Sequence, residues 1–167
     1  RWECRTVVAA IPPPVVFGRL LPEDVDPTRA SGDRPLAPSF ARLSVGLGCE
    51  LSGAVYETGV GGLDGCAITV PTVIDRGWSP PGTSVATCTI PVVPTAERWP
   101  PERAEQVSDT LLGRLDRYLW PGIRSVVEVT DLAQPATYPR YLGAPLGSVL
   151  GYALGPRHRA VAARTGV

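Results

Sequence analysis

The chain of 167 residues contains no methionine and no lysine, and it has a single histidine. All 16 basic residues are therefore arginine, and 16 acidic residues balance them to a formal net charge of zero. The lack of lysine excludes a P-loop lysine and a lysine Schiff base within this chain. The balanced charge argues against a nucleic-acid-binding surface, so we expect no nucleic-acid partner.

Metal-binding and nucleophilic motifs are also scarce. Cys4, Cys49, Cys66 and Cys88 form no C-x-x-C pair, and His158 stands alone between two arginines. A structural zinc site needs closely spaced ligands, and a Ser-His-Asp catalytic triad or a Cys-His catalytic dyad needs a well-placed histidine. We therefore predict no metal site, and we expect the cysteines to be reduced, buried and small in a cytoplasmic protein.

The start of the chain lacks the features of a processed or complete product. The chain begins at Arg1, and its first residues lack the basic region and long apolar core of a signal peptide. We expect an internal segment of a longer protein, called the parent chain below. Its length suits one domain with a hydrophobic core.

Alternating apolar residues and β-branched runs predict several strands. Two of them flank a proline-rich turn at 75–84, which predicts an antiparallel hairpin. The glycine-rich stretch 59–65 is interpreted as a turn rather than a phosphate loop, because a strand and not a helix is expected after it. The predicted strands cover residues 4–10, 40–51, 66–72, 84–94 and 123–132, and residues 15–22 are predicted to form one or two helical turns.

One long helix is predicted over residues 100–122. Pro101 suits a first helical turn, and Pro121 followed by glycine ends the pattern. An apolar stripe runs along one side through Val107, Leu111, Leu115 and either Tyr118 or Leu119. Strands around one amphipathic helix predict an α+β fold with a mostly antiparallel or mixed sheet.

Glycines recur at positions 143, 147, 151 and 155, a spacing seen where membrane helices pack closely. The apolar run from Leu142 to Pro156 is roughly 15 residues, short of the ~20 that a membrane span requires, and it contains Pro145. We therefore exclude a spanning helix. Two alternatives remain: a backbone path against a planar apolar ligand, or a glycine-rich loop packed on the rest of the protein.

Catalytic residues are not assigned from the sequence. The carboxylates at 23–26 lie in a polar loop, and those at 102–109 lie on the solvent side of the predicted helix. Asp131 is the one carboxylate at a strand end ahead of the glycine segment.

The segment QPATYPRYLGAPLGSVLGYA resembles the late part of phytoene desaturases, carotenoid isomerases and retinol saturases. The family pattern reads approximately T-P-x-T-[FY]-x-R-[YF]-x-G-x-P-x-G-[SA]-x-[YW]-G. Gln134, Leu146 and Leu150 depart from it, and residues 5–22 and 76–94 are also similar to the family. The matching residues are Pro135, Thr137, Tyr138, Arg140, Tyr141, Gly143, Pro145, Gly147, Ser148 and Gly151.

The resemblance implies a two-domain FAD-dependent oxidoreductase of the amine-oxidase-like clan, of which this chain is the substrate-domain portion. Residues 1–12 would end a flavin-domain strand and cross over, 13–131 would belong to the substrate domain, and 132–167 would return toward the flavin domain. FAD would be bound mainly by parts of the parent chain outside this sequence. That flavin-binding domain and a hydrophobic small molecule are the expected partners, and peripheral membrane contact is left open.

The resemblance also implies site residues. Gly147, Gly151 and Tyr152 are expected near the flavin, with the backbone of the two glycines exposed beside a concave surface. Contact with the substrate is expected at Pro135, Thr137 and Tyr141.

The implied reaction is flavin hydride transfer to or from an isoprenoid or carotenoid-like substrate, giving desaturation or saturation. The alternatives are a flavin-dependent polyene isomerase and a non-enzymatic α+β binding module. A piece of a larger enzyme should leave an apolar face uncovered and bring its two ends together, whereas a self-standing module should close its core.

Overall fold

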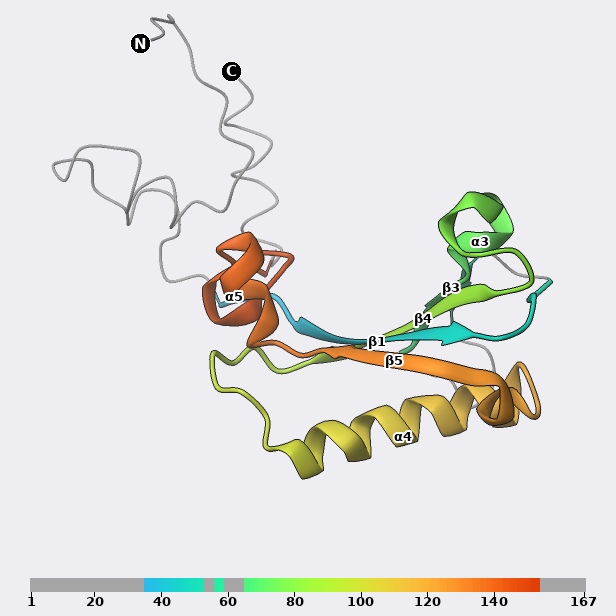
Figure 1. Cartoon of the computed structure of the whole chain (residues 1–167). Coiled ribbons are helices and arrows are strands. Elements are labelled where there is room, and N and C mark those ends of the chain that lie inside the picture. The colour runs from blue at the N-terminus through green and yellow to red at the C-terminus, as the bar shows by residue number, and fades with distance from the viewer. Residues whose placement is uncertain (1–34, 53–55, 59–64, 154–167) are drawn as a thin grey trace, which may run out of the picture.

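The computed structural model describes residues 35–52, 56–58 and 65–153, which form one antiparallel sheet with a long helix across one face (Figure 1). The strand order is β2-β3-β4-β1-β5, and every neighbouring pair is antiparallel. The strands are β1 Ser39–Leu47, β2 Tyr56–Thr58, β3 Ala67–Thr69, β4 Ser84–Val92 and β5 Val127–Ala133. The helices are α3 Pro71–Ile74, α4 Pro101–Tyr118 and α5 Thr137–Leu142, with short 3-10 turns η2 Arg76–Trp78, η3 Ile123–Val126 and η4 Pro145–Gly147. The predicted α+β class with an antiparallel sheet is confirmed for the described residues.

The central strand β1 alternates buried and more exposed positions, as the sequence predicts for a half-buried strand. Leu43 lies opposite Cys88 and Val45 lies opposite Ala86, so the apolar side chains of β1 and β4 share one face. All four residues are at most 1% exposed, which makes this face the centre of the hydrophobic core.

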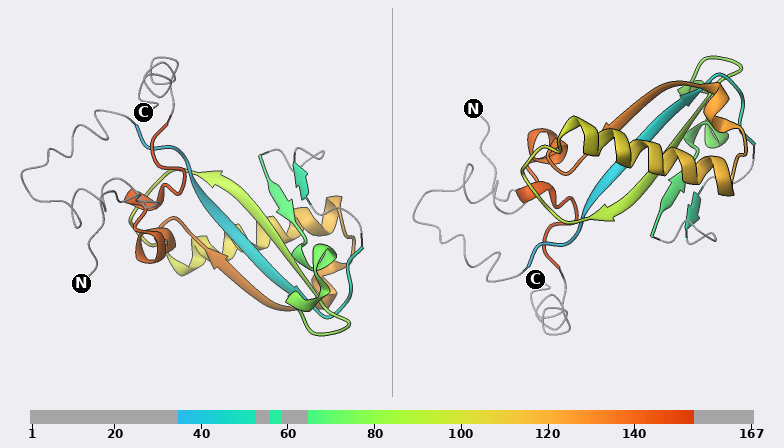
Figure 2. Two further views of the ribbon diagram at one scale, coloured as in Figure 1. Left: turned by 90° about the horizontal axis from the view of Figure 1, so that it is seen from above. Right: turned by 90° about the horizontal axis from the view of Figure 1, so that it is seen from below.

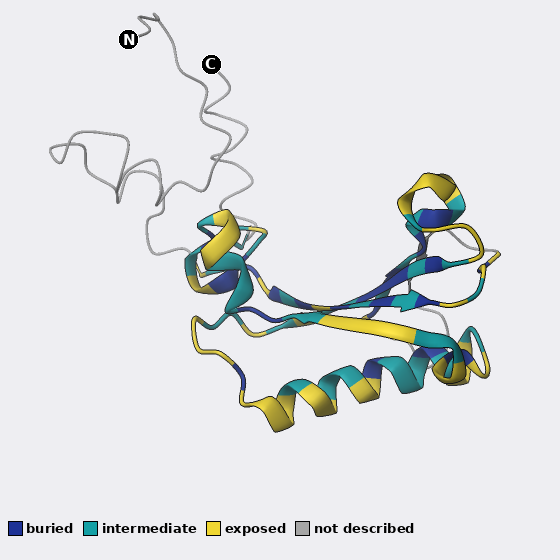
Figure 3. Cartoon of the chain, in the orientation of Figure 1, coloured by how far each residue is buried: buried dark blue, intermediate teal, exposed yellow. Residues whose placement is uncertain are grey.

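Helix α4 covers that face, as the view from below in Figure 2 shows. Leu111 and Leu115 are buried against the sheet, and Leu119 packs beside them just beyond the helix end. Tyr118 is 42% exposed, so Leu119 completes the apolar stripe and Tyr118 does not. The outward side of α4 is mostly exposed, as Figure 3 shows.

All four predicted strands within the described residues are shorter than expected; the 40–51 strand ends at Leu47 and the 84–94 strand ends at Val92. The 66–72 strand is reduced to Ala67–Thr69, because Pro71 occupies the first turn of α3. The 123–132 strand begins only at Val127, because Gly122 in the left-handed region starts the 3-10 turn η3 instead. The predicted antiparallel pairing of β3 and β4 is confirmed, but α3 and η2 lie in their connection, so the predicted tight loop is wrong. The predictions for 4–10 and 15–22, and most of 59–65, lie outside the described residues.

The cysteines of the described part are free thiols inside or beside the core. Cys66 and Cys88 are buried, and a guanidinium nitrogen of Arg114 donates to Cys66 Sγ at 3.5 Å. Burial is the main cause that raises the pKa of Cys88 to about 12, and the neighbouring Cys66 is the second. Cys88 is therefore a neutral, apolar side chain at physiological pH, as the sequence predicts.

The sheet face away from α4 carries a different chemistry. Arg42 and Ser44 of β1 lie opposite Thr89 and Thr87 of β4, so this face bears a charge and several hydroxyls. In Figure 1, α3 and α5 lie above opposite ends of this face, and no described element covers it between them.

The two ends of the described main segment run side by side. Leu36 and Tyr152 form an isolated antiparallel bridge. The Ala37 amide donates to the Gly151 carbonyl at 2.9 Å, and the Ala153 amide donates to the Pro35 carbonyl at 2.8 Å. We call this pairing of 35–37 with 151–153 the neck. The expectation that the two ends of the chain come together concerns residues 1–34 and 154–167, which lie outside the described residues.

Candidate functional site

The segment that carries the family-like motif begins with a compact turn after β5. The backbone amide of Gln134 donates to Thr137 Oγ1 at 3.2 Å, and the backbone amide of Thr137 donates to the backbone carbonyl of Gln134 at 2.8 Å. Helix α5 then runs to Leu142 and ends at Gly143, whose φ of 63° is left-handed. The first part of the motif is therefore a short helix at the end of the sheet.

Gly147 is required by the packing of this segment on itself. Its φ is +76°, and a Cβ at this position would lie against the Pro135 backbone. Gly147 is buried, and Ser39 Oγ donates to its carbonyl at 2.5 Å. The expectation of an exposed backbone is therefore wrong at Gly147, because this residue is buried and the Pro135 carbonyl lies where its Cβ would be.

Ser148 ties the segment to the neck. Its side chain is 1% exposed, and Oγ lies 2.8 Å from the Ala37 carbonyl and 2.7 Å from the Gly151 carbonyl. Gly151 has a φ of +73° with open space at its Cβ position. The left-handed backbone conformation, and not a lack of space, therefore favours glycine at this position. Neither Gly147 nor Gly151 lies in a regular α-helix.

These contacts decide what the segment offers to a flavin. The Gly147 amide donates to the Ala144 carbonyl, and the Gly151 amide donates to the Ser148 carbonyl. The Gly147 carbonyl accepts from Ser39 Oγ, and the Gly151 carbonyl accepts from the Ala37 amide. A phosphate site would need free backbone amides converging on one point. The described residues provide none at these glycines, so they do not fit the phosphates of FAD. Only the open side of Gly151 is left for the approach of a ring.

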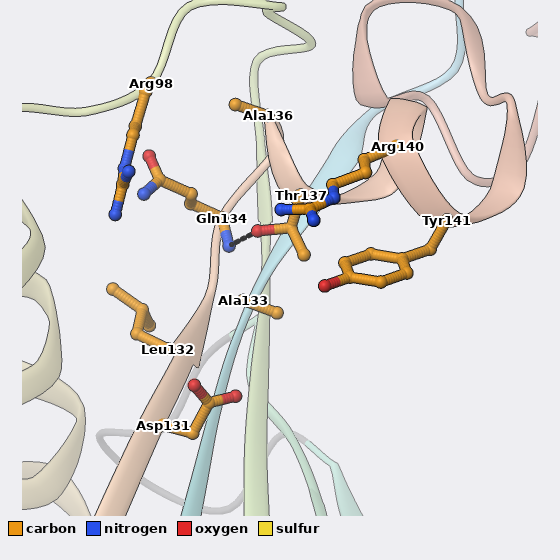
Figure 4. A pocket seen from close by; sticks show the side chains of 9 residues that line it. All are labelled: Arg98, Asp131, Leu132, Ala133, Gln134, Ala136, Thr137, Arg140 and Tyr141. Atoms are coloured by element: carbon orange, nitrogen blue, oxygen red, sulfur yellow. Dashed lines mark hydrogen bonds between the residues drawn. The ribbon is translucent and has the colours of Figure 1, made fainter.

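A pocket of about 520 Å³ lies where β5, α5 and the residues before α4 meet (Figure 4). Thr137 and Tyr141, both predicted to contact substrate, line this pocket together. Pro135 does not line it and is fully buried beneath. Asp131, singled out by its place at a strand end, also lines the pocket.

The polar groups that sequence reasoning missed are Arg98, Gln134 and Arg140. Arg140 belongs to the matched motif, and Gln134 is a departure from it, so both carried a usable signal. Arg98 had none, because it lies more than 30 positions upstream and reaches the pocket only through folding. The guanidinium of Arg140 lies 5.5 Å from the ring centre of Tyr141.

Tyr138 lies on α5 above the uncovered sheet face. Burial raises the pKa of its phenol, and the nearby Arg42 opposes this in part. Tyr138 is therefore a neutral hydroxyl at physiological pH. The side of the sheet that faces away from α4 presents hydroxyls, the Arg42 guanidinium and the Asp131 carboxylate, which lies opposite Ser44.

Two further findings concern the described residues alone. They contain no cluster of histidine, cysteine and acidic side chains placed to hold a metal ion. Within the same ranges, no helix is both long enough and apolar enough to span a membrane.

No model of a known protein family matches the chain. A comparison with curated proteins finds a chloroplastic prolycopene isomerase of Daucus carota, 26% identical over 153 residues. The chain is similar to a carotenoid isomerase over most of its length. The match covers 79% of this chain and spans 25% of the length of the relative. The similarity supports the resemblance to the desaturase and isomerase family at this distant level.

Proposed function

We propose that the chain is the substrate-domain portion of a longer FAD-dependent enzyme that acts on a hydrophobic isoprenoid by hydride transfer. The observation that carries the proposal is the similarity to prolycopene isomerase, which covers 79% of this chain at 26% identity. The relative is about four times as long as the matched part, so a parent chain of that kind leaves room for a separate flavin-binding domain.

Two features of the structure support a piece of a larger protein over a self-standing module. The neck brings the described ends together, as needed for a domain attached to another through both ends. Four large apolar side chains between 141 and 150 are at least half exposed: Tyr141, Leu142, Leu146 and Leu150. A closed binding module would cover such a group, whereas a surface that meets another domain leaves it open.

In this proposal the side of the sheet away from α4, together with α5, faces the substrate. A bound flavin would accept or return the hydride. The residues of this chain would position the polyene and exclude water. The neutral Tyr138 and the threonines of β4 could contact a polyene on this face, beside the guanidinium of Arg42. Proximity of Gly147, Gly151 and Tyr152 to the flavin remains part of this proposal.

Isomerisation is the second candidate, because the relative's name is that of an isomerase. Desaturation removes two hydrogens from the substrate, saturation adds two, and isomerisation leaves the mass unchanged. The three reactions therefore differ in the mass and retention of the product.

The test is expression of the parent protein and its visible absorption spectrum, followed by turnover of carotenoid and retinoid substrates at controlled redox potential. We expect a flavin band and a product that differs from the substrate in hydrogen content or geometry. A colourless, folded parent protein that takes up no added FAD would refute the flavin proposal.

A flavoprotein without activity on any isoprenoid would refute the substrate class and leave the flavin assignment intact. The cytoplasmic location and peripheral membrane contact stay predictions for the parent protein, to be tested by fractionation.

A further inference from the structure

We propose that the pocket between β5, α5 and Arg98 binds an oxyanion, a carboxylate or phosphate group on a small molecule. The guanidiniums of Arg98 and Arg140, the side-chain amide of Gln134 and the hydroxyl of Tyr141 would hold it. A hydrocarbon polyene has no such group, so this site goes beyond the proposed function and does not rest on it.

The first argument is a buried donor without an acceptor. Gln134 is 8% exposed, and its Oε1 accepts a hydrogen bond from the Trp99 amide at 2.5 Å. Because the backbone amide is a donor, it fixes the oxygen of Gln134 toward Trp99 and turns the NH₂ group the other way. That NH₂ group has no acceptor among the described residues, although buried polar groups normally have one.

The second argument is the charge beside this amide. The ion pairs within residues 35–52 and 65–153 are Arg76–Glu50 and Arg124–Asp109. Arg98 and Arg140 therefore have no acidic partner there, and both line the pocket with Gln134. Figure 4 shows the Arg98 guanidinium beside the Gln134 side chain. Arg98 and Arg140 lie on opposite sides of Gln134 and Thr137 in Figure 4, so a ligand held by both would lie between them. Guanidinium forks suit carboxylate and phosphate oxygens.

The one carboxylate of the pocket sets the position of the ligand. Asp131 lies at the other end of the pocket from Arg98 and Arg140 in Figure 4. An oxyanion would be repelled from that end and attracted to the arginine end. The hydroxyl of Tyr141 points into the space between the Asp131 end and the arginine end of the pocket, and it can donate to the ligand.

The experiment uses the full 167-residue chain and three probes: inorganic phosphate, inorganic diphosphate and octanoate. Binding is measured by calorimetry and by the side-chain NMR signals of arginine and glutamine. We expect saturable binding of at least one probe. Preference for octanoate identifies a carboxylate ligand, and preference for phosphate or diphosphate identifies a phosphorylated one.

The variants separate a built site from general attraction to positive charge. Arg98→Gln and Arg140→Gln should each weaken binding roughly tenfold, since each removes charge-assisted hydrogen bonds. Asp131→Asn should strengthen binding a few-fold, because it removes a nearby like charge. Arg117→Gln is the matched control, an exposed arginine on α4 outside this pocket.

Arg98, Arg140 and Asp131 are all exposed, so these substitutions should leave the fold intact, which circular dichroism checks. No saturable binding of any probe would overturn the proposal. Equal weakening by Arg117→Gln and by the two pocket variants would also overturn it, because binding would then follow net charge alone.

Discussion

At the scale of single residues, Gly147 shows how a functional-looking motif can have a local structural cause. The sequence resemblance implies that this glycine opens the backbone toward a ligand. In the structure, the position of its missing Cβ is occupied by the Pro135 carbonyl. The chain thus crosses its own backbone at this point, and only glycine combines the positive φ with so close an approach.

Gly147→Ala should therefore destabilise the domain by at least ~3 kcal/mol, since a strained left-handed conformation adds to a clash with rigid backbone. Urea denaturation of the full chain measures the loss. Gly82→Ala and Gly151→Ala are matched controls, because both glycines have positive φ with nothing within 4 Å of the Cβ position. Each control should cost ~1–2 kcal/mol. Equal costs for Gly147 and Gly82 would contradict the crossing of the two backbones.

At the scale of elements, the neck depends on the residue that follows η4. Ser148 comes directly after this 3-10 turn, and its buried hydroxyl lies within hydrogen-bond distance of a carbonyl on each strand of the neck. The segment that carries the motif is therefore joined to residues more than 100 positions earlier. This explains the combination of glycine and serine in the motif without reference to a ligand.

Ser148→Ala should cost ~1–3 kcal/mol, because the Ala37 carbonyl loses its hydroxyl partner in a buried place. The loss should be local, so amide hydrogen exchange at Ala37 and Ala153 should accelerate more than exchange in β1 and β4. Ser125→Ala is the control, since that exposed hydroxyl bonds only to the nearby Gly122 carbonyl. If exchange at the neck is unchanged in Ser148→Ala, the neck does not depend on this side chain.

The elements also show what the sequence could predict. Period-3.6 and period-2 patterns identified α4 and β1, because both bury one face against the same core. The shorter extent of β3 was foreseeable from Pro71, whose place in a first helical turn competes with the strand. The pocket was not predictable, because it depends on how the residues before α4 approach β5. Such contacts between distant segments leave no local pattern in the sequence.

At the scale of the whole molecule, the domain has two unlike sides. One side of the sheet buries its apolar residues under α4. The other side presents hydroxyls and Arg42, and α5 lies above one end of it (Figure 1). Large exposed apolar side chains gather between 141 and 150, close in sequence to the neck. This asymmetry fits a domain whose α4 side faces solvent and whose other side meets the rest of a parent chain.

The same asymmetry predicts that the 167-residue chain will not bind FAD by itself. Gly147 and Gly151 use their amides and carbonyls in hydrogen bonds within the domain, so these two glycines offer no cradle for the cofactor phosphates. Titration of the chain with FAD, followed by flavin fluorescence and calorimetry, should show no saturable binding at micromolar concentrations. The full parent protein is the positive control, and its binding should survive Gly82→Ala. Tight binding of FAD by the isolated chain would mean that this domain itself builds the cofactor site, and the assignment of FAD binding to other parts of the parent chain would be wrong.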